Sequence, residues 1–196
     1  MKNVVCKGIL KIWKRGICGE KIGREKEMWY VIQTKAGREE AVKQKAERML
    51  PQNSFRDCKV LYCIHKKRYL GEWHEEREQF LPGYIFLVTD DSAAAAKVMK
   101  EITEFTRLLG SGREACPIGK EEEKLLEKLA GDQDEIGMSY GVIEKGVLKI
   151  KDGVLAGLEP AVKKIDRHKR KGYIRLSLPD GQEKLVGVGL EITEKS

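Results

Sequence analysis

The pattern of hydrophobic and polar positions in the first half of the chain predicts strands that alternate with helices. Residues 29–34 are a β-rich run, and the turn residues 35–37 close it. From Arg38 to Leu50 the apolar positions recur on one helical face, and Pro51 prevents the helix from continuing. The folded part of the chain is therefore predicted to open with a strand and a helix.

Residues 80–88 form the most apolar segment and predict a central strand. Their hydrophobic continuity indicates burial on both faces, and the pair Pro82 and Gly83 predicts a bend where the strand begins. In residues 59–79, which precede this segment, apolar and polar positions first alternate, and basic and then acidic residues follow. This pattern favours a hairpin or an extended arm.

Further elements complete an α+β domain. Residues 90–92 can cap a helix that runs to about Ile102, because their side chains accept hydrogen bonds from free backbone amides. A short strand is predicted around residues 107–109, and the next helix, over residues 120–130, has leucines on one face. We expect this domain to span residues 28–130.

The last third of the chain has the pattern of a small β-barrel. Residues 131–144 are predicted to be a linker, because this stretch begins acidic, rich in glycine and poor in large apolar residues. Beyond it, short strands alternate with turns that contain Asp-Gly. We expect a barrel domain over residues 145–196, with strands near residues 147–151, 161–166, 173–178 and 183–188.

The positive charge is concentrated in two segments, while residues 28–130 are nearly neutral. Of the net charge of +7, residues 161–175 contribute +6, from seven Lys or Arg and one Asp. Residues 1–27 contribute +5, which suits a flexible basic arm. An upstream start codon would also explain this extension, because Met28 directly precedes the first strand, and both explanations remain open.

The sequence excludes several classes of function. It has no phosphate-binding loop, zinc-protease motif or serine nucleophile elbow, so we expect no enzyme and no cofactor. It has no apolar run near the roughly 20 residues of a membrane span, and lysines interrupt the apolar N-terminus, so we expect neither a membrane segment nor a secretion signal.

The five cysteines include no C-x-x-C pair, which indicates free thiols in a reducing cytoplasm. The only cluster of Cys and His residues is formed by Cys58, Cys63 and His65. Alternation along a strand explains this cluster without a metal, and we expect no metal site.

Two signatures resemble those of the NusG family of transcription elongation factors. Residues 28–31, Met-Trp-Tyr-Val, and residues 81–85, Leu-Pro-Gly-Tyr-Ile, look like the opening strand and the F-P-G-Y-V signature of the NusG N-terminal (NGN) domain. Residues 148–158 resemble the start of a KOW motif. The resemblance covers residues 28–196 and implies an NGN α/β sandwich followed by a small SH3-like KOW β-barrel, in a cytoplasmic monomer.

The resemblance also implies that the Pro-Gly strand helps to bind the clamp helices of the RNA polymerase β′ subunit. A few buried aromatic side chains typically dominate the energy of such an interface. The alternative is that the same side chains are core residues of the domain. The residues implied in polymerase binding are Trp29, Tyr30, Leu81, Pro82, Gly83, Tyr84 and Phe86.

The basic run in the last third predicts a nucleic-acid surface, with a solvated charged turn as the alternative. Lys and Arg neutralise phosphates, and Arg also recognises guanine edges. Because the major groove of a regular RNA duplex is deep and narrow, we expect the target to be a nascent RNA hairpin with a distorted stem, loop or bulge. The predicted RNA-binding residues are Lys149, Lys151, Lys163, Lys164, Arg167, His168, Lys169, Arg170, Lys171 and Arg175.

A second basic cluster, Lys66, Lys67 and Arg68, is expected at the tip of the predicted hairpin. The acidic residues 75–76 follow closely. A self-neutralising hairpin and a contact with polymerase or with DNA near the transcription bubble both remain open.

Within the family, the basic run resembles that of the specialised LoaP paralogues, which are associated with antitermination of selected operons. Leu155 and Leu158 stand where general NusG proteins commonly have Phe, and Pro160 replaces the usual Gly, so contacts with ribosomal protein uS10 or Rho are in doubt. Leu81 likewise replaces a Phe. We predict an operon-targeted elongation and antitermination factor; the alternatives are a general elongation factor whose KOW domain binds uS10 or Rho, and a ribosome-associated protein.

Overall fold

The structure, a computed structural model, describes residues 28–50, 55–102, 106–111, 114–130 and 134–196. Within these ranges three α-helices combine with strands that form four sheets. The predicted basic extension, residues 1–27, lies outside the described residues.

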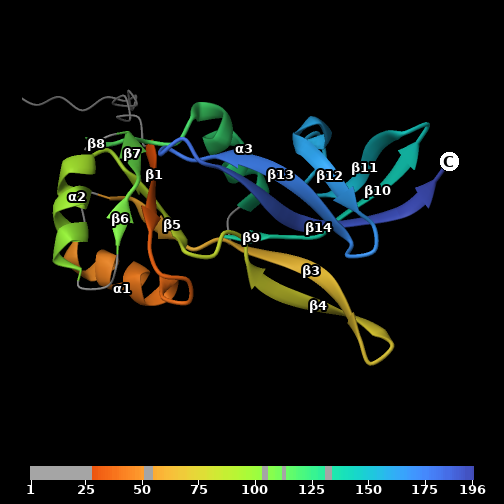
Figure 1. Cartoon of the computed structure of the whole chain (residues 1–196), viewed down its shortest axis with the longest axis horizontal. Coiled ribbons are helices and arrows are strands. Elements are labelled where there is room, and N and C mark those ends of the chain that lie inside the picture. The colour runs from red at the N-terminus through yellow and green to blue at the C-terminus, as the bar shows by residue number, and fades with distance from the viewer. Residues whose placement is uncertain (1–27, 51–54, 103–105, 112–113, 131–133) are drawn as a thin grey trace, which may run out of the picture.

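A four-stranded sheet with the order β2-β5-β1-β6 is the centre of the N-terminal lobe, our name for the described residues between 28 and 136 (Figure 1). Its strands are β1 (Met28–Gln33), β2 (Asp57–Lys59), β5 (Tyr84–Thr89) and β6 (Arg107–Leu108), and a separate pair is formed by β7 (Gly110–Ser111) and β8 (Glu114–Ala115). Every residue of β5 is buried, as its continuous apolar sequence predicts.

Three helices pack on this lobe. The helices α1 (Glu39–Met49) and α2 (Ser92–Glu101) share a buried cluster with Ile32 and Ile85 on one face of the sheet. The helix α3 (Lys120–Ala130) contributes its leucines to a second cluster. None of the described helices is long and apolar enough to cross a membrane.

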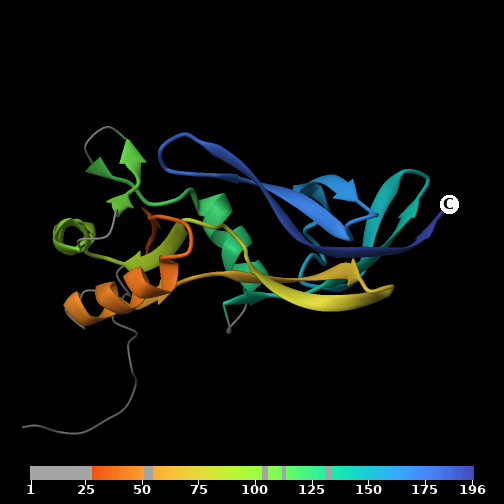
Figure 2. The same ribbon diagram turned by 60° about the horizontal axis from the view of Figure 1, so that its bottom comes forward.

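A long hairpin extends from the N-terminal lobe and runs beside the C-terminal sheet (Figure 2). It consists of β3 (Tyr62–Tyr69) and β4 (Glu72–Gln79), as the sequence predicts. Leu70 and Gly71 join the strands with φ angles of 52° and 86°, which are typical of a two-residue type I′ turn. The short strand β9 (Glu135–Ile136) pairs in parallel with the start of β3.

The C-terminal lobe, residues 138–196, is a five-stranded sheet with the order β11-β10-β14-β13-β12. Its elements are β10 (Ser139–Glu144), β11 (Val147–Gly153), η1 (Glu159–Ala161), β12 (Val162–Asp166), β13 (Lys171–Ser177) and β14 (Glu183–Lys195). The first part of β14 pairs with β13 and the last part pairs in parallel with β10, so this one strand holds both parts of the sheet together.

The structure differs from the predicted linker over residues 131–144, because β9 and β10 form from residue 135 onward. Ile136 and Ser139 are fully buried there. Gly141 fits because a Cβ atom at this position would lie 2.7 Å from the carbonyl oxygen of Lys149 on the paired strand. A glycine that suggested flexibility is thus a position of close strand packing.

The predicted bend before β5 is held by a buried carboxylate. Glu39 is 1% exposed, and its Oε1 accepts a hydrogen bond of 2.6 Å from the Gly83 amide. Gly83 has a φ of 86°, and its carbonyl accepts a hydrogen bond of 2.8 Å from the Thr34 amide. Burial opposes ionisation of Glu39, but hydrogen bonds from backbone amides outweigh it and lower the pKa of this carboxyl.

Substitution of Glu39 by Ala should lower the free energy of unfolding by about 1–3 kcal/mol, because the buried Gly83 amide would lose its acceptor. Urea unfolding followed by circular dichroism measures this change. The control is Glu47→Ala in the same helix, where an exposed pair with Lys43 should contribute about 0.5 kcal/mol or less. Equal effects of the two substitutions would contradict the anchoring role of Glu39.

Candidate functional site

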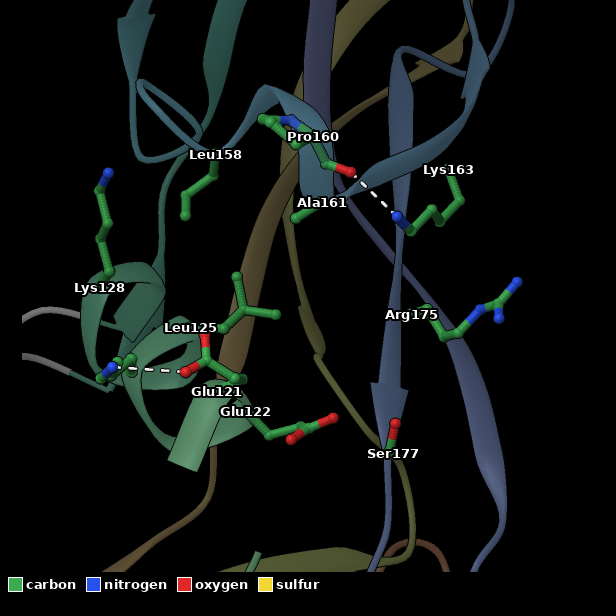
Figure 3. A pocket seen from close by; sticks show the side chains of 11 residues that line it. Glu121, Glu122, Leu125, Lys128, Leu158, Pro160, Ala161, Lys163, Arg175 and Ser177 are labelled. Carbon is green, nitrogen blue, oxygen red and sulfur yellow. Dashed lines mark hydrogen bonds and ion pairs between the residues drawn. The ribbon is translucent and has the colours of Figure 1, made fainter. Parts of the chain in front are cut away.

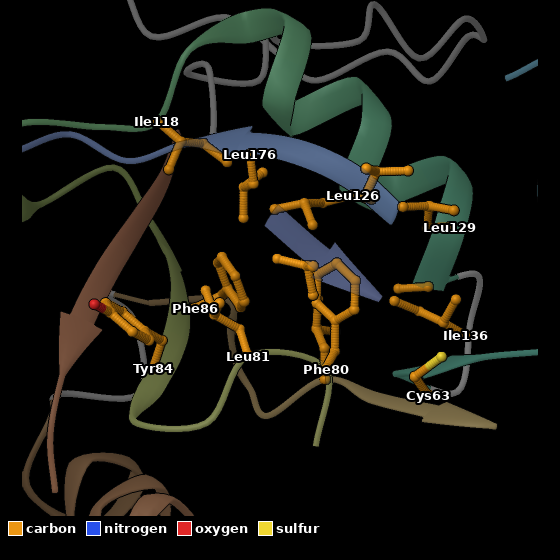
Figure 4. Close-up of a cluster of buried hydrophobic side chains, with 14 of the residues drawn as sticks. Cys63, Phe80, Leu81, Tyr84, Phe86, Ile118, Leu126, Leu129, Ile136 and Leu176 are labelled. Atoms are coloured by element: carbon orange, nitrogen blue, oxygen red, sulfur yellow. The ribbon is translucent and has the colours of Figure 1, made fainter. Parts of the chain in front are cut away.

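One face of the β1–β5 sheet carries most of the predicted polymerase-binding side chains. Alternate residues of a strand point to opposite faces, so Trp29, Tyr84 and Phe86 share the face that looks away from α1 and α2. The rings of Trp29 and Phe86 have centroids 5.9 Å apart. Leu81, from the bend before β5, lies beside Phe86 (Figure 4). We call these four side chains the apolar face.

The C-terminal lobe and α3 of the N-terminal lobe together cover the apolar face, because Leu126 and Leu129 belong to the same buried cluster. Ile174 and Leu176 of β13 and Val186 of β14 belong to the same buried cluster. As a result, the exposed fractions of Trp29, Leu81, Tyr84 and Phe86 are only 5%, 8%, 7% and 1%. The surface implied in partner binding is therefore an interface between the two lobes in this structure.

The remaining predicted polymerase-binding residues do not join the apolar face. Tyr30 packs on the opposite side of the sheet, in the cluster beneath α1 and α2, because it neighbours Trp29 along the strand. Pro82 is exposed, and Gly83 supplies the backbone geometry of the bend.

The backbones of the two lobes meet at Gly189. A Cβ atom at this position would lie 2.4 Å from the carbonyl oxygen of Ile64 in β3 and 2.3 Å from the sulfur of Met138. Only glycine therefore allows β14 to pack this closely against β3. Gly187, on the same strand, would place its Cβ no closer than 3.4 Å to any neighbour.

Charged side chains surround this seam between β3 and β14. Lys66 of β3 forms an ion pair of 2.8 Å with Glu191 of β14, and Lys171 of β13 pairs with Glu78 of β4 at 3.4 Å. Both pairs join one lobe to the other. Hydrogen bonding to Glu191 raises the pKa of Lys66, which therefore stays charged.

The ten predicted RNA-binding residues are spread over β11, β12, β13 and the turn between β12 and β13. Six of them lie outside this turn: Lys149 beside Glu144, exposed Lys151, Lys163 donating to the Pro160 carbonyl, Lys164 over the Tyr173 ring, Lys171 beside Glu78, and Arg175 beside Glu183.

The turn between β12 and β13 presents three consecutive exposed residues of the basic run. Arg167, His168 and Lys169 are exposed, and the Lys169 amide donates a hydrogen bond of 2.9 Å to Asp166. This hydrogen bond lowers the pKa of the Asp166 carboxyl. The turn is thus a defined structure that presents three basic residues.

The last residue of the turn, Arg170, packs against the β3–β4 hairpin. The Arg170 guanidinium lies 3.7 Å from the centroid of the Trp73 ring, and it pairs with Glu191 at 2.9 Å. Trp73 was not among the predicted site residues. The sequence shows two basic clusters, at residues 66–68 and 163–175, but no local signal indicates that they lie together.

The loop before η1 is also engaged with the N-terminal lobe. Leu155 is fully buried, and Leu158 lines a pocket of about 530 Å³ with Leu125 of α3 (Figure 3). The loop at which the sequence departs from general NusG proteins therefore faces α3 in this structure.

The predicted Cys and His cluster is divided by the fold. Cys58 belongs to the cluster beneath α1 and α2, whereas Cys63 belongs to the cluster between the lobes. Burial raises the pKa of Cys58 to about 12 and that of Cys63 to about 11, so both thiols stay protonated at neutral pH.

His65 forms a small cluster with two carboxylates, Glu76 and Glu78, among the described residues. Its Nε2 lies 3.3 Å from Glu78. The carboxylates also pair with Lys67 and Lys171, so their charge is compensated by side chains.

The fold and these surfaces define a two-lobed binding protein that contains an apolar face and a basic turn. A family model for NusG, described as a transcription termination factor, matches residues 27–127, and the chain belongs to the NusG family. It is a NusG-like transcription termination and antitermination factor, and the prediction that it is not an enzyme is confirmed.

Curated relatives and a solved structure agree with this assignment. The chain is 25% identical to the transcription termination/antitermination protein NusG of Halalkalibacterium halodurans over 173 residues, which cover 85% of this chain and 96% of the relative. The same protein from Bacillus subtilis is 25% identical over 174 residues, with the same coverage. A structure described as domain interaction in Thermotoga maritima NusG has the same fold, with a TM-score of 0.51, 19% identity, and coverage of 85% of this chain and 96% of that one.

Acidification should destabilise the seam through His65. The side chain is 4% exposed, and burial, followed by the charge of Lys171, lowers its pKa below 6.5, although Glu78 and Glu76 act in the opposite direction. The unfolded chain binds this proton at a higher pH than the folded chain, so stability should fall as the pH drops through about 6.5. Urea unfolding between about pH 7.5 and 5.5 measures this slope, and His65→Gln should reduce it. Identical slopes would contradict the role of His65.

Proposed function

We propose that this NusG-family protein is an operon-targeted elongation and antitermination factor of the LoaP type. Its NGN domain, residues 28–130, binds RNA polymerase, and its KOW domain, residues 145–196, binds a nascent RNA hairpin. The observation that carries this proposal is the combination of an apolar aromatic face on one lobe with an exposed basic turn on the other.

The apolar face suits a protein partner because it gathers four large side chains on one side of a sheet. Contiguous apolar surfaces mark interaction sites when they are exposed, as this face would be if the lobes separated. The β13–β14 hairpin now covers it, and a peripheral ion pair of 3.7 Å between Arg107 and Asp180 lies at the hairpin's end. In the proposed function, polymerase replaces this hairpin on the apolar face.

The basic turn suits RNA because Arg167 and Lys169 project without a carboxylate within ion-pair distance among the described residues. Such side chains can neutralise phosphates without first giving up a partner. DNA near the transcription bubble offers the same phosphate chemistry and is a further candidate contact.

A second candidate is a general elongation factor whose KOW domain binds a protein such as uS10 or Rho. The pocket beside α3 favours it, because Leu125, Leu158, Pro160 and Ala161 give that pocket an apolar lining that suits a protein side chain (Figure 3). The two candidates differ in whether the C-terminal lobe contacts RNA.

Gly189→Ala should increase the affinity for RNA polymerase. The added methyl group would clash with the Ile64 carbonyl and destabilise the closed arrangement of the lobes. Each 1.4 kcal/mol by which the closed arrangement is destabilised should tighten the apparent binding of polymerase up to about tenfold. Gly187→Ala is the control, because its methyl group would make ordinary contacts. Hydrogen exchange of β1 and β5 measures opening. If opening occurs without tighter polymerase binding, the apolar face is not the polymerase surface.

Substitution of Arg167 and Lys169 by Ala should remove RNA binding at selected leaders. Crosslinking to nascent RNA with sequencing measures the effect, and the wild-type protein should enrich a few leaders. The control is the double substitution of exposed Lys120 and Lys124 by Ala, which changes the net charge equally. A genome-wide spread of crosslinks would instead support a general factor.

A further inference from the structure

The β3–β4 hairpin and the turn between β12 and β13 form one groove, although about a hundred residues separate them in the sequence. The groove encloses about 350 Å³. Both lobes line it, and its lining includes Lys66, Lys67, Arg68, Trp73, His168 and Lys169.

Part of the positive charge in this groove is available for a ligand. Arg68 and Lys169 are exposed, and among the described residues neither side chain has a carboxylate within 4.0 Å. Lys67 pairs with Glu76, at 3.4 Å on the surface. Surface pairs of this kind are weak, so a phosphate can replace the carboxylate at little cost.

Three contacts hold the groove in shape. Arg170 stacks on Trp73 and pairs with Glu191, which fixes the turn on the hairpin. Lys66 pairs with the same Glu191. The cationic side chains are therefore arranged before a ligand arrives, which reduces the entropy cost of binding.

The hairpin tip next to the groove carries exposed aromatic and apolar side chains. Tyr69 is 44% exposed and stacks on His74 with centroids 3.8 Å apart. Leu70 is 93% exposed, and Trp73 is 36% exposed. Aromatic side chains beside cations are typical of sites that bind unpaired nucleotides, because bases stack on the rings while the cations follow the phosphates.

We propose that this groove binds RNA with unpaired nucleotides, and that the binding site extends across both lobes. Lys67, Arg68 and Lys169 contact phosphates, and an unpaired base stacks on Tyr69 at the hairpin tip. The inference rests on the proposed RNA binding, but it adds the hairpin of the N-terminal lobe to the site. It also requires the lobes to be packed together when RNA binds.

The first test is the double substitution Lys67→Ala and Arg68→Ala in the full chain. We expect weaker binding to a labelled stem-loop RNA. Because two phosphate contacts are lost, the slope of log affinity against log salt concentration should become shallower by about 1.4. The substitution of Lys120 and Lys124 by Ala is the control and should leave binding unchanged. If the hairpin variant binds like the wild-type protein while the Arg167 and Lys169 variant does not, this inference is wrong and the proposed function stands. If neither variant affects binding, RNA binding by the basic turn is wrong as well.

The second test addresses the unpaired nucleotides. The wild-type protein should bind the stem-loop about tenfold more tightly than a blunt duplex with the same stem. Tyr69→Ala should remove most of this preference, whereas Tyr69→Phe should keep it, because the exposed ring is retained. Equal binding of stem-loop and duplex by the wild-type protein would overturn the proposal.

The third test addresses the contribution of both lobes. Gly189→Ala should weaken RNA binding several-fold, because the apparent affinity falls with the fraction of molecules that remain closed. Gly187→Ala should leave RNA binding unchanged. Unchanged or tighter RNA binding by an opened Gly189→Ala protein would show that the turn acts without the hairpin.

Discussion

The burial of the apolar face by the β13–β14 hairpin is the interaction on which the arrangement of the two lobes depends. Full burial of one large apolar side chain contributes about 1.5–3 kcal/mol, and the contact joins aromatic side chains such as Trp29 and Phe86 to aliphatic ones such as Leu176 and Val186. Because the cluster is continuous through both lobes, opening them exposes apolar surface on each. The packed arrangement is therefore stabilised by keeping both surfaces away from water.

The seam determines how the lobes are oriented, while the apolar contact supplies most of the attraction. Gly189 allows the backbones of β14 and β3 to approach, and any side chain there would force them apart. The ion pairs of Lys66 and Lys171 across the seam are partly exposed, so they select one orientation and add little net stability.

Local sequence patterns predicted the elements that depend on local physics. The continuous apolar run of β5, the Pro-Gly bend and the period of α1 all appear in the structure. Patterns could not reveal contacts between distant segments. Gly141 contributed to the predicted linker because its close neighbour, Lys149, lies on another strand, and a local pattern does not show that contact. Likewise, the basic run did not indicate that Glu191 and Glu78 would hold Arg170 and Lys171 at the seam.

The same closure has opposite effects on the two proposed binding surfaces. It buries the apolar face, which polymerase would need, and it assembles the groove between the hairpin and the basic turn. Two ligands that prefer different arrangements of one protein must weaken each other's binding by the same factor. Under both proposals, RNA in the groove therefore opposes polymerase binding, and polymerase on the apolar face separates the hairpin from the basic turn. Lys169 and its neighbours in the turn belong to the lobe that is displaced, so they can keep their RNA contacts through this exchange.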